Sequence, residues 1–488
     1  MRPGPGSRPS LPRRVGIERR LRARRGLGGH LRLRAGNPRH LAPGPRSSSR
    51  HLRLRRRHPR DLGRILPWPA FLAHVPSSGR ARDPSPRSMS LAPGRCSVRG
   101  SPGGRATCGA PAGKGSSTAL EEIMRIAVPK ETTPGERRVA LVPENVTRLV
   151  KQQHEVRIER GAGAAAGFVD AAYEAAGASL AEGPALLAGA EAIVRVQRPS
   201  EAEADLLPEG ALLVGLLAPH LSGPLLQRLA ARRVSALAME KVPRTTRAQS
   251  MDALSSQATL AGYKAVLLGA SALPRILPMM TTAAGTLAPA KTFVVGAGVA
   301  GLQALATARR LGAIVSAFDV RPVVKEQVQS LGASFVEVPQ VAAEAAGGYA
   351  KELAASEQER VLGAIGAHVK DMDLVVTTAQ IPGRPAPRLL TAAMIRSMRP
   401  GSVVVDLAAE AGGNCELTRP GETVVEAGVT ILGPLNLPST VPFHASQMYG
   451  RNVTTLLQHL SRDGRLALDP GDEIAGAMLV VHDGQVRV

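Results

Sequence analysis

Cysteine is scarce in this chain of 488 residues: there are three, and Cys96 and Cys108 both lie in the first quarter of the sequence. A disulfide framework therefore cannot organise the fold, and a zinc site built from cysteines is disfavoured because only Cys415 remains. Long apolar runs are also missing. The longest, around residues 211–218, has the size of a strand and not of a membrane span of roughly 20 residues. We therefore expect any membrane role to come through a partner.

Acidic residues are rare in the first 123 residues, which hold 27 Lys and Arg but only 5 Asp and Glu. The remaining 365 residues are near neutral, with 35 basic and 34 acidic side chains. The basic segment contains 26 Arg and a single Lys, Lys114, among many Pro and Gly residues. It has no apolar periodicity, so it cannot bury enough surface to offset the entropy of ordering. We expect residues 1–123 to be a disordered tail.

Three interpretations of this tail compete. A mitochondrial transit peptide is rich in Arg and poor in acids, but it is usually shorter and less interrupted by Pro and Gly. A nucleic-acid-binding arm usually adds Lys and aromatic stacking residues. Translation upstream of the true start in GC-rich DNA explains both the abundance of Arg, Pro, Gly and Ala and the shortage of Lys. We favour this last interpretation, which places the native start at Met124 and the tail outside the native protein.

From Met124 onward, short apolar runs alternate with helical stretches. We expect strands at Arg125–Val128, His154–Ile158, Ala192–Val196, Ala211–Leu217, Thr292–Val295, Ile314–Phe318, Ser334–Val338, Leu374–Thr377, Val403–Asp406 and Thr430–Leu432, and helices at Pro143–Gln152, Asp252–Gly269, Leu302–Leu311 and Ser446–Leu460. Such alternation predicts parallel sheets covered by helices on both faces. The predicted fold is therefore α/β, with two Rossmann-like, doubly wound domains and a cleft between them. The first domain is residues 124–262 completed by 445–488, and is thus discontinuous; the second is residues 263–444.

A glycine-rich motif opens the second domain. The run Phe293-Val294-Val295 leads into Gly296-Ala297-Gly298-Val299-Ala300-Gly301, and a helical pattern follows. In a dinucleotide-binding turn the first glycine permits the tight turn, the second lets the backbone approach a pyrophosphate, and the third lets the helix pack on the strand. A bare G-x-G-x-x-G is a weak signal, but here the strand and the helix that it needs flank it. We expect Gly296, Gly298, Val299 and Gly301 to bind a dinucleotide.

Asp319 ends the next predicted strand, 23 residues after Gly296. A carboxylate at this place accepts hydrogen bonds from the ribose 2′-OH of NAD and repels the 2′-phosphate of NADP. Like unit charges 4 Å apart repel by about 4 kcal/mol at an effective dielectric constant of 20. Arg321 complicates this assignment because an arginine there can bind a 2′-phosphate. The sequence favours NAD(H).

A polar cluster precedes the long helix predicted from Asp252. Residues 241–256 are dense in hydrogen-bonding side chains, including Arg244, Gln249, Asp252 and Ser255. A helix N-terminal cap explains one or two of them, with Ser250 or Asp252 accepting from free N–H groups. It does not explain all four, which points to a binding or catalytic loop.

The polar cluster belongs to a series of motifs that resembles a known family. These are Arg244–Asp252 followed by Leu-Ser-Ser-Gln and Leu-Ala-Gly-Tyr, Arg138–Pro143, Thr281–Thr286, Gly347–Glu352, Ile381–Pro387, Glu410–Cys415 and Asn436–Ser439. In this order they resemble the NAD(H)-binding component of proton-translocating NAD(P) transhydrogenase, in the form in which this component is a separate peripheral subunit. The resemblance runs from Met124 to about Leu460 and does not cover the tail.

The resemblance implies direct hydride transfer between NAD(H) on this chain and NADP(H) on a partner subunit, with a membrane-spanning partner coupling the transfer to proton movement. Catalysis would depend on those partners. Hydride transfer needs positioning and not a proton donor, which amide and hydroxyl groups supply. The resemblance also implies a homodimer and a peripheral place on the cytoplasmic side of a bacterial membrane. It implies no metal and no nucleic acid.

The implied site residues come from several motifs. Gln249 is expected to reach across to the second nucleotide, while Arg244, Asp252 and Ser255 orient the nicotinamide. Tyr349 lies in what resembles a mobile loop that closes over the nucleotide, and Leu353 stands where Met is common. Gln380 stands where the family more often has Leu. The full cofactor-binding set is Arg244, Thr245, Thr246, Gln249, Asp252, Gly296, Gly298, Val299, Gly301, Asp319, Val320, Arg321, Gly348, Tyr349 and Gln380.

Alanine dehydrogenase offers a competing interpretation, since it shares the fold and much of the N-terminal pattern. That enzyme needs a Lys to hold the substrate carbonyl and a His for proton exchange. Its Lys-Val-Lys-Glu-Pro segment corresponds here to Arg195–Pro199, which keeps neither Lys, and the position of its His is Ala218. His220 lies two residues further on and would project differently. The sequence therefore disfavours an amino-acid dehydrogenase. It likewise disfavours a third class, nucleic-acid binding through the tail, as the main function.

Overall fold

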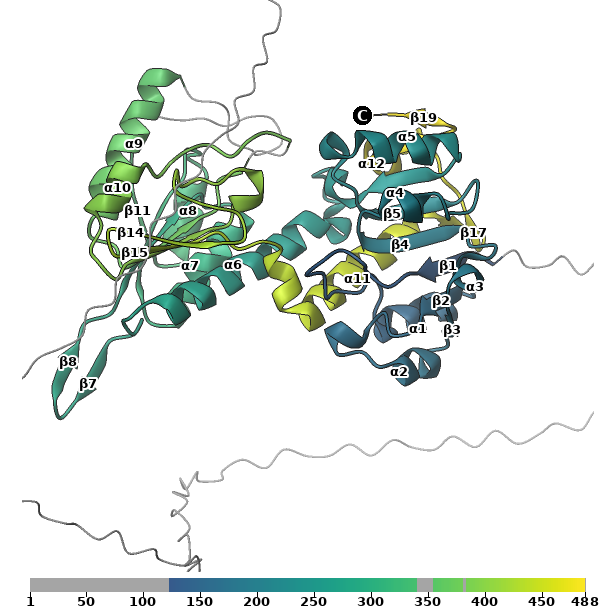
Figure 1. Ribbon diagram of the computed structural model, residues 1–488, viewed down its shortest axis with the longest axis horizontal. Coiled ribbons are helices and arrows are strands. Elements are labelled where there is room, and N and C mark those ends of the chain that lie inside the picture. Colours follow the sequence, from purple (N-terminus) through teal and green to yellow (C-terminus); the bar gives the residue numbers. More distant parts are fainter. Residues whose placement is uncertain (1–122, 340–353, 381–382, 488) are drawn as a thin grey trace, which may run out of the picture. The chain divides into compact units, whose positions relative to one another are not determined.

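The computed structural model describes residues 123–339, 354–380 and 383–487, in which two large sheets carry the fold (Figure 1). The first sheet has eight strands in the order β19-β18-β6-β5-β4-β1-β2-β3, and the second has seven in the order β11-β10-β9-β12-β13-β15-β14. In each sheet the parallel strands follow the doubly wound order 3-2-1-4-5-6, if they are numbered from the first strand of that sheet. The predicted α/β class with two Rossmann-like sheets is confirmed.

The first sheet draws its strands from both ends of the described chain. Its strands are β1 (Arg125–Val128), β2 (Glu155–Glu159), β3 (Ser179–Ala181), β4 (Ala192–Gln197), β5 (Leu212–Leu216), β6 (Ser235–Ala238), β18 (Leu479–His482) and β19 (Gln485–Val486), with helices α1 (Pro143–Lys151), α2 (Asp170–Ala175), α3 (Pro184–Leu187), α4 (Glu201–Ala204), α5 (Gly223–Ala231), α11 (Pro442–Leu460) and α12 (Glu473–Met478). Strand β18 pairs antiparallel with β6. The C-terminal segment therefore completes this sheet, as the predicted discontinuity requires.

The second sheet lies wholly between the two parts of the first. Its strands are β9 (Lys291–Val295), β10 (Ile314–Phe318), β11 (Ser334–Phe335), β12 (Leu374–Thr377), β13 (Val403–Asp406), β14 (Thr423–Glu426) and β15 (Val429–Leu432), with helices α6 (Ala253–Ala272), α7 (Val299–Arg310), α8 (Val324–Ser330), α9 (Ala355–Val369) and α10 (Ala392–Ser397). Two small hairpins stand outside both sheets, β7 (Met280–Thr282) with β8 (Gly285–Leu287) and β16 (Ser461–Arg462) with β17 (Arg465–Leu466).

The prediction was accurate for several central strands and missed others, including the buried strands β6 and β18. The observed bounds of β1, β10, β12 and β13 match the predicted bounds, whereas β3, β6, β14, β18, β19 and the two hairpins had no predicted counterpart. Strand β11 is shorter than predicted and ends at Phe335. Its last paired residue lies opposite Ala317, one residue before β10 ends, so little of the partner strand remains to extend the pairing.

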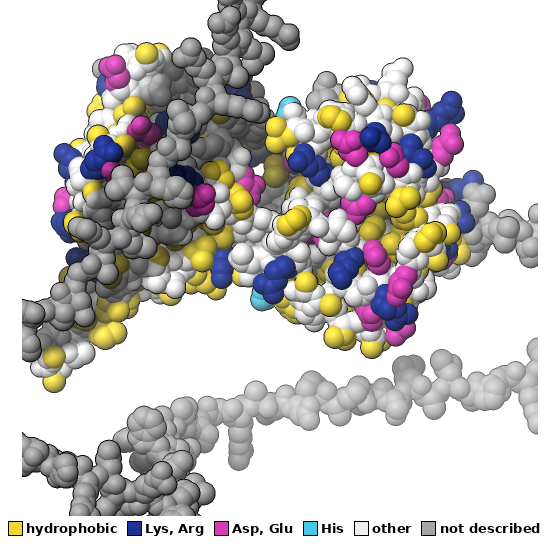
Figure 2. Space-filling model, in the orientation of Figure 1, with side chains coloured by type: hydrophobic (Ala, Val, Ile, Leu, Met, Phe, Trp, Pro, Cys, Tyr) yellow, Lys and Arg dark blue, Asp and Glu magenta, His cyan; other side chains and the backbone are white. Residues whose placement is uncertain are grey.

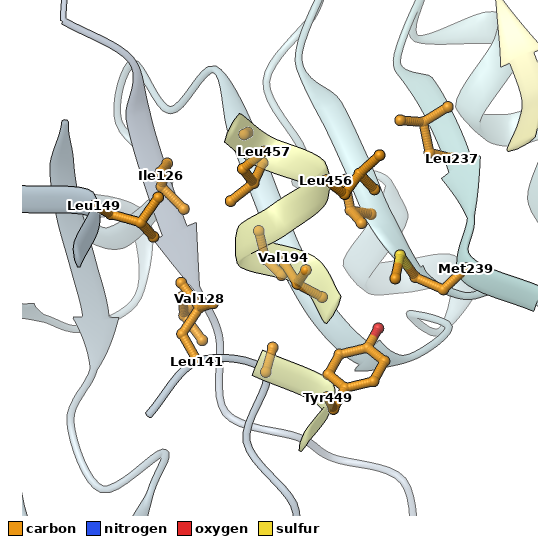
Figure 3. Packing of buried hydrophobic residues seen from close by; sticks show 14 of the residues in the cluster. Ile126, Val128, Leu141, Leu149, Val194, Leu237, Met239, Tyr449, Leu456 and Leu457 are labelled. Carbon is orange, nitrogen blue, oxygen red and sulfur yellow. The ribbon is translucent and has the colours of Figure 1, made fainter. Parts of the chain in front are cut away.

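Helix α11 supplies much of the core of the first sheet (Figure 3). Its Leu456 and Leu457 are fully buried beside Val194 and Leu237 of the sheet. Tyr449 of the same helix is also buried and donates a hydrogen bond to the backbone oxygen of Arg195, at 2.7 Å. The N-terminal strands therefore depend for their core on a helix that begins more than 200 residues after β6 ends.

Helices α6 and α7 pack with almost no space between their backbones. A Cβ atom added at Gly262 of α6 would lie 2.0 Å from the carbonyl oxygen of Ala300 in α7. Further along α6, a Cβ at Gly269 would lie 2.4 Å from Leu374 of the second sheet. Glycine is a poor helix former, but at this position it is the residue that allows the helices to touch. No helix in the described ranges is both long and apolar enough to cross a membrane.

Replacing Gly262 with Ala should therefore destabilise the protein. The added methyl group must displace backbone and not a flexible side chain, so we expect a loss of at least about 2 kcal/mol in the free energy of unfolding. Urea denaturation followed by circular dichroism measures it. Gly363→Ala in α9 is the matched control, because an added Cβ there meets nothing within 4 Å. That control should be neutral or stabilising by up to about 1 kcal/mol. Equal effects of the two changes would contradict the close-packing argument.

Candidate functional site

The glycine-rich segment forms the turn between β9 and α7. Gly296 has a φ of +92°, in the left-handed region that favours glycine, and a Cβ there would lie 2.9 Å from Thr378 Oγ1. A Cβ at Gly301 would lie 1.9 Å from the carbonyl oxygen of Gly296. The first and third glycines of the motif are therefore required by the turn and by the packing of the helix, as the sequence indicated.

Gly298, the second glycine, is in a different situation. A Cβ at this position would meet nothing nearer than Arg321 Nη2, at 3.9 Å. The residue caps α7, a helix of 12 residues whose first N–H groups have no partner within the helix, and Val299 beside it is 42% exposed. An open backbone at a helix N-terminus is suited to a pyrophosphate. The chain thus has the cradle that NAD(H) needs.

The turn lies at the switch point of the second sheet, where β9 has β10 on one side and β12 on the other. Thr378, just after β12, donates its hydroxyl to the carbonyl oxygen of Gly296 at 2.7 Å. Asn414 holds Ala379 from both sides, accepting from its N–H at 3.0 Å and donating to its oxygen at 2.8 Å. Gln380 is exposed and donates to the oxygen of Leu407 at 3.1 Å. A leucine could not make this bond, so Gln380 ties together the segments after β12 and β13.

Asp319, just after β10, faces the glycine-rich turn. Its Oδ2 accepts a hydrogen bond from the N–H of Ala297 at 2.8 Å. The guanidinium of Arg321 forms a two-nitrogen fork on the same carboxylate, at 2.9 Å from Nε to Oδ1 and 2.8 Å from Nη2 to Oδ2. Asp319 is therefore beside the glycine-rich turn and paired with Arg321, and its contact with a ribose stays a prediction. Val320 between them is partly buried.

The predicted polar cluster divides into two parts. Asp252 caps α6, with Oδ1 accepting from Ser255 N at 2.9 Å and Oδ2 accepting from Ser255 Oγ at 2.6 Å. Gln249 begins the short 3-10 turn η4 (Gln249–Met251) and is exposed, as is Arg244. The helix cap thus accounts for Asp252 and Ser255 and does not account for Gln249 and Arg244. A second role for the capping pair stays a prediction.

The remaining predicted cofactor residues have mixed surroundings. The hydroxyl of Thr245 is buried and has no hydrogen-bond partner among the described residues, while Thr246 is exposed. Gly348, Tyr349 and Leu353 lie outside the described residues, so their roles stay predictions. In the described ranges, no group of three His, Cys, Asp or Glu side chains is placed to hold a metal ion.

A buried ionic network that the sequence analysis did not identify lies near the carboxyl ends of β1 and β4. Arg138 donates to both carboxylate oxygens of Glu136, at 2.8 and 2.6 Å, and the two side chains are 2% and 0% exposed. Arg138 also donates to Gln257 of α6 at 2.8 Å and to Asn436 at 3.1 Å. Gln197 and Asn436 each donate to Glu136 at 2.9 Å. The only sequence signal was the motif Arg138–Pro143, which has no spacing typical of an ion pair.

These contacts decide the ionisation of Glu136. Burial alone would raise the pKa of its carboxyl group, but the hydrogen bonds and charge of Arg138, with bonds from Gln197 and Asn436, outweigh burial and lower the pKa to about 2. Glu136 is therefore ionised at neutral pH, and its charge is matched by Arg138 within the protein.

A second buried carboxyl lies beside the first. Glu131 accepts from the N–H groups of Val196 at 2.6 Å and Gln197 at 3.3 Å. Arg195 lies 3.8 Å from Glu131 and 3.0 Å from Glu203. Burial raises the pKa of Glu131 to about 7, although Arg195 and the backbone bonds act in the opposite direction. Charged side chains of the protein, paired with one another, thus lie at the switch point of the first sheet.

The same geometry weighs against amino-acid dehydrogenation. Gln197 stands where that enzyme needs a lysine, and its amide is used on Glu136. Ala218 stands where a histidine would be needed and donates its N–H to the carboxylate of Glu240. His220 follows in the short turn η2 (Pro219–Leu221), is exposed, and a Cβ at Gly383 would lie 2.9 Å from its ring. The groups that would bind and protonate an amino-acid substrate are therefore not assembled.

The ionisation of Glu136 predicts a pH-dependent contribution to stability. Its pKa is lower in the folded protein than the ordinary value of 4.5, so the contribution is complete above about pH 4.5 and is lost as the pH falls towards 2. Glu136→Gln should cost on the order of 3 kcal/mol at pH 7, and the difference from wild type should shrink below about pH 5. Denaturation of both proteins at several pH values measures this. Glu155→Gln, at a carboxylate 43% exposed, should cost less than about 0.5 kcal/mol throughout. A difference for Glu136→Gln that does not change with pH would contradict the assignment.

Comparison with known proteins agrees with this geometry. Residues 127–261 match the family described as "Alanine dehydrogenase/PNT, N-terminal domain", and residues 265–488 match its C-terminal domain. The chain is 47% identical to an NAD(P) transhydrogenase subunit alpha protein of Rhodospirillum rubrum over 374 residues, which cover 74% of this chain and 97% of that one. The solved transhydrogenase of Sinorhizobium meliloti is 44% identical, with a TM-score of 0.69, and matches 74% of this chain and 100% of its own.

Alanine dehydrogenases are more distant. "Alanine dehydrogenase 2" of Staphylococcus aureus is 32% identical, over 65% of this chain and 82% of that one. The higher identity to transhydrogenase subunits agrees with the arrangement of Gln197 and Ala218, which lacks the groups of an amino-acid dehydrogenase. The chain belongs to the alanine dehydrogenase/PNT family, and within it to the NAD(P) transhydrogenase alpha subunits.

Proposed function

We propose that this chain is the NAD(H)-binding subunit of a proton-translocating NAD(P) transhydrogenase. The observation that carries the proposal is the glycine-rich turn at the switch point of the second sheet, with Asp319 facing it. The identity to transhydrogenase alpha subunits extends over both sheets and supports the same function. Titration of the purified chain with NADH, followed by nicotinamide fluorescence, tests it directly. Absence of saturable NADH binding would overturn the proposal.

The chain's role in the reaction is to bind and position one nucleotide. When bound, NAD(H) supplies or accepts the hydride at its nicotinamide ring. The N–H groups at the start of α7 and the open backbone at Gly298 hold the pyrophosphate, and Asp319 holds the ribose. Gln249, Arg244 and the Asp252–Ser255 pair form the loop that orients the nicotinamide. None of these groups donates a proton, and a hydride transfer needs none.

The reaction requires partners that this chain does not contain. The second nucleotide, NADP(H), is held by another subunit, and a membrane-spanning subunit couples transfer to proton movement. The relatives' names as alpha subunits support such an assembly. The chain would then sit on the cytoplasmic side of a bacterial membrane through those subunits. Its domains would be residues 124–262 with 445–488, and residues 263–444. The described surface supports a protein partner more than nucleic acid, because basic and acidic side chains are interspersed around the first sheet (Figure 2).

Gln249 is the residue that we assign to the second nucleotide. It is exposed at the start of η4, whereas Asp252 and Ser255 are bonded to each other. A contact that forms only when both nucleotides are aligned acts on the transition state and spares ground-state NADH binding. Gln249→Asn keeps the amide and shortens its reach by one methylene, about 1.5 Å.

Gln249→Asn should slow hydride transfer at least about tenfold in a complex reconstituted with the NADP(H)-binding subunit, because a misplacement of about 1 Å can cost on the order of 100-fold. The NADH dissociation constant should change less than about threefold. Stopped-flow transfer and equilibrium titration measure the two quantities. Equal losses in both would make Gln249 an ordinary NADH ligand. An unchanged rate of hydride transfer would show that Gln249 has no role in the reaction.

We also propose that the subunit is a homodimer and that the β7–β8 hairpin contributes to the contact. Every residue from 279 to 288 is exposed, including Met279 at 66% and Leu287 at 53%. The hairpin projects away from the second sheet (Figure 1), and apolar side chains are visible there (Figure 2). An isolated two-stranded hairpin is marginally stable in water and needs a surface to pack on. A second copy of the chain supplies one, as the resemblance to the transhydrogenase family implies.

A double change of Met280 and Leu287 to Glu should convert the dimer into a monomer, because the carboxylates would have to be buried at the contact. Sedimentation velocity at micromolar concentration measures the change. Val169→Glu is the control, since Val169 is 65% exposed beside the first sheet and should leave the dimer intact. A dimer that survives the double change would exclude the hairpin from the contact. A wild-type monomer would exclude the homodimer itself.

A further inference from the structure

Arg321 occupies all the hydrogen-bonding capacity that Asp319 has left. A carboxylate offers about four acceptor positions, and four donors reach Asp319. Arg321 supplies three of them, from its N–H and Nε to Oδ1 at 2.9 Å each and from Nη2 to Oδ2 at 2.8 Å. The N–H of Ala297 supplies the fourth, at 2.8 Å. No acceptor position remains for a ribose hydroxyl while this pair is intact.

The guanidinium of Arg321 also lies close to the phosphate cradle. Its Nη2 is the nearest atom to the position of a Cβ on Gly298, at 3.9 Å. The Arg321 side chain is 17% exposed and that of Asp319 is 5% exposed. The fork thus stands between the turn that would hold the pyrophosphate and the carboxylate that would hold the ribose. A nucleotide that uses both must displace it.

We infer that Arg321 is a specificity-determining residue: it caps Asp319 until a nucleotide displaces it, and this exchange sets the preference between NADH and NADPH. The inference rests on the proposed function, since it concerns the site at which NAD(H) binds. NADH must replace charge-assisted bonds of the Arg–Asp pair by bonds from uncharged hydroxyls, which weakens its binding. NADPH brings a 2′-phosphate that Asp319 repels but that the displaced Arg321 attracts. Arg321 therefore reduces the discrimination that Asp319 alone would give.

The sharpest test removes the charge of Arg321 and keeps most of its length. In Arg321→Met the carboxylate loses the guanidinium and keeps only its two backbone N–H donors, at positions 297 and 321. Its charge is then uncompensated, so NADH should bind more tightly and NADPH more weakly. We expect the ratio of the NADPH to the NADH dissociation constant to rise at least fivefold above that of wild type. Asp319→Asn should lower the ratio. In that background Arg321→Met should raise the ratio less than it does beside Asp319, because only the attraction of Arg321 for the 2′-phosphate is then lost. The same titrations with 5′-ADP and 2′,5′-ADP should follow the same pattern, because they carry only the adenosine half.

Two further proteins keep the test decisive. Lys325→Met removes a cation of α8 from an exposed ion pair with Glu337, which follows β11, and should leave the ratio unchanged. Arg321→Lys keeps the charge without the fork, and should give an intermediate ratio. Circular dichroism and unfolding midpoints verify that each variant is folded. If wild type binds NADH but Arg321→Met leaves the ratio of the NADPH to the NADH dissociation constant unchanged or lowers it, this inference is wrong and the proposed function still stands. Failure of wild type to bind either nucleotide overturns the proposed function and this inference with it.

Discussion

The buried ion pair between Glu136 and Arg138 joins parts of the chain that are far apart in sequence. Its hydrogen bonds reach Gln197 at the end of β4, Gln257 in α6 and Asn436 after the second sheet. Neither charge can be left alone, because an unpaired buried charge is far more costly than the pair is beneficial. These segments must therefore take up their places together, and the two sheets are linked by the same constraint.

The two sheets repeat one topology but use their switch points differently. In the first sheet, buried and paired charged side chains lie near the carboxyl ends of β1 and β4, including Glu131 and Arg195. In the second, the corresponding place has an open glycine at the start of α7, and the carboxylate of Asp319 after β10 faces the same turn. Ligands of doubly wound sheets bind at the switch point. The second sheet presents an open backbone to a nucleotide there, whereas the first presents buried charges that are already paired within the protein.

The close contact between helices α6 and α7 connects the polar loop to the nucleotide-binding turn. Helix α6 touches α7 at Gly262, and α7 is the helix whose first turn faces the nucleotide site. Because α6 also carries the polar loop at its N-terminus, capped by Asp252, one rigid helix connects the loop to the domain that holds the glycine-rich turn. Positioning of a hydride donor depends on such rigidity, since errors of about 1 Å are costly in rate.

The sequence by itself determined the parts that depend on local pattern. Runs of Val and Ile predicted β9, β10, β12 and β13, and the spacing of glycines with Asp319 predicted the nucleotide turn. These features depend only on residues that are neighbours in sequence, since hydrophobic periodicity and the backbone conformations of glycine are local properties. Only the tertiary structure decided which charges meet. Nothing near Glu136 indicated that its partners would be Gln197 and Asn436. The sequence placed Arg321 two residues from Asp319, but only the structure showed that its guanidinium is bonded to that carboxylate. The strength of a polar contact depends on burial and on the exact approach of groups that the fold alone brings together.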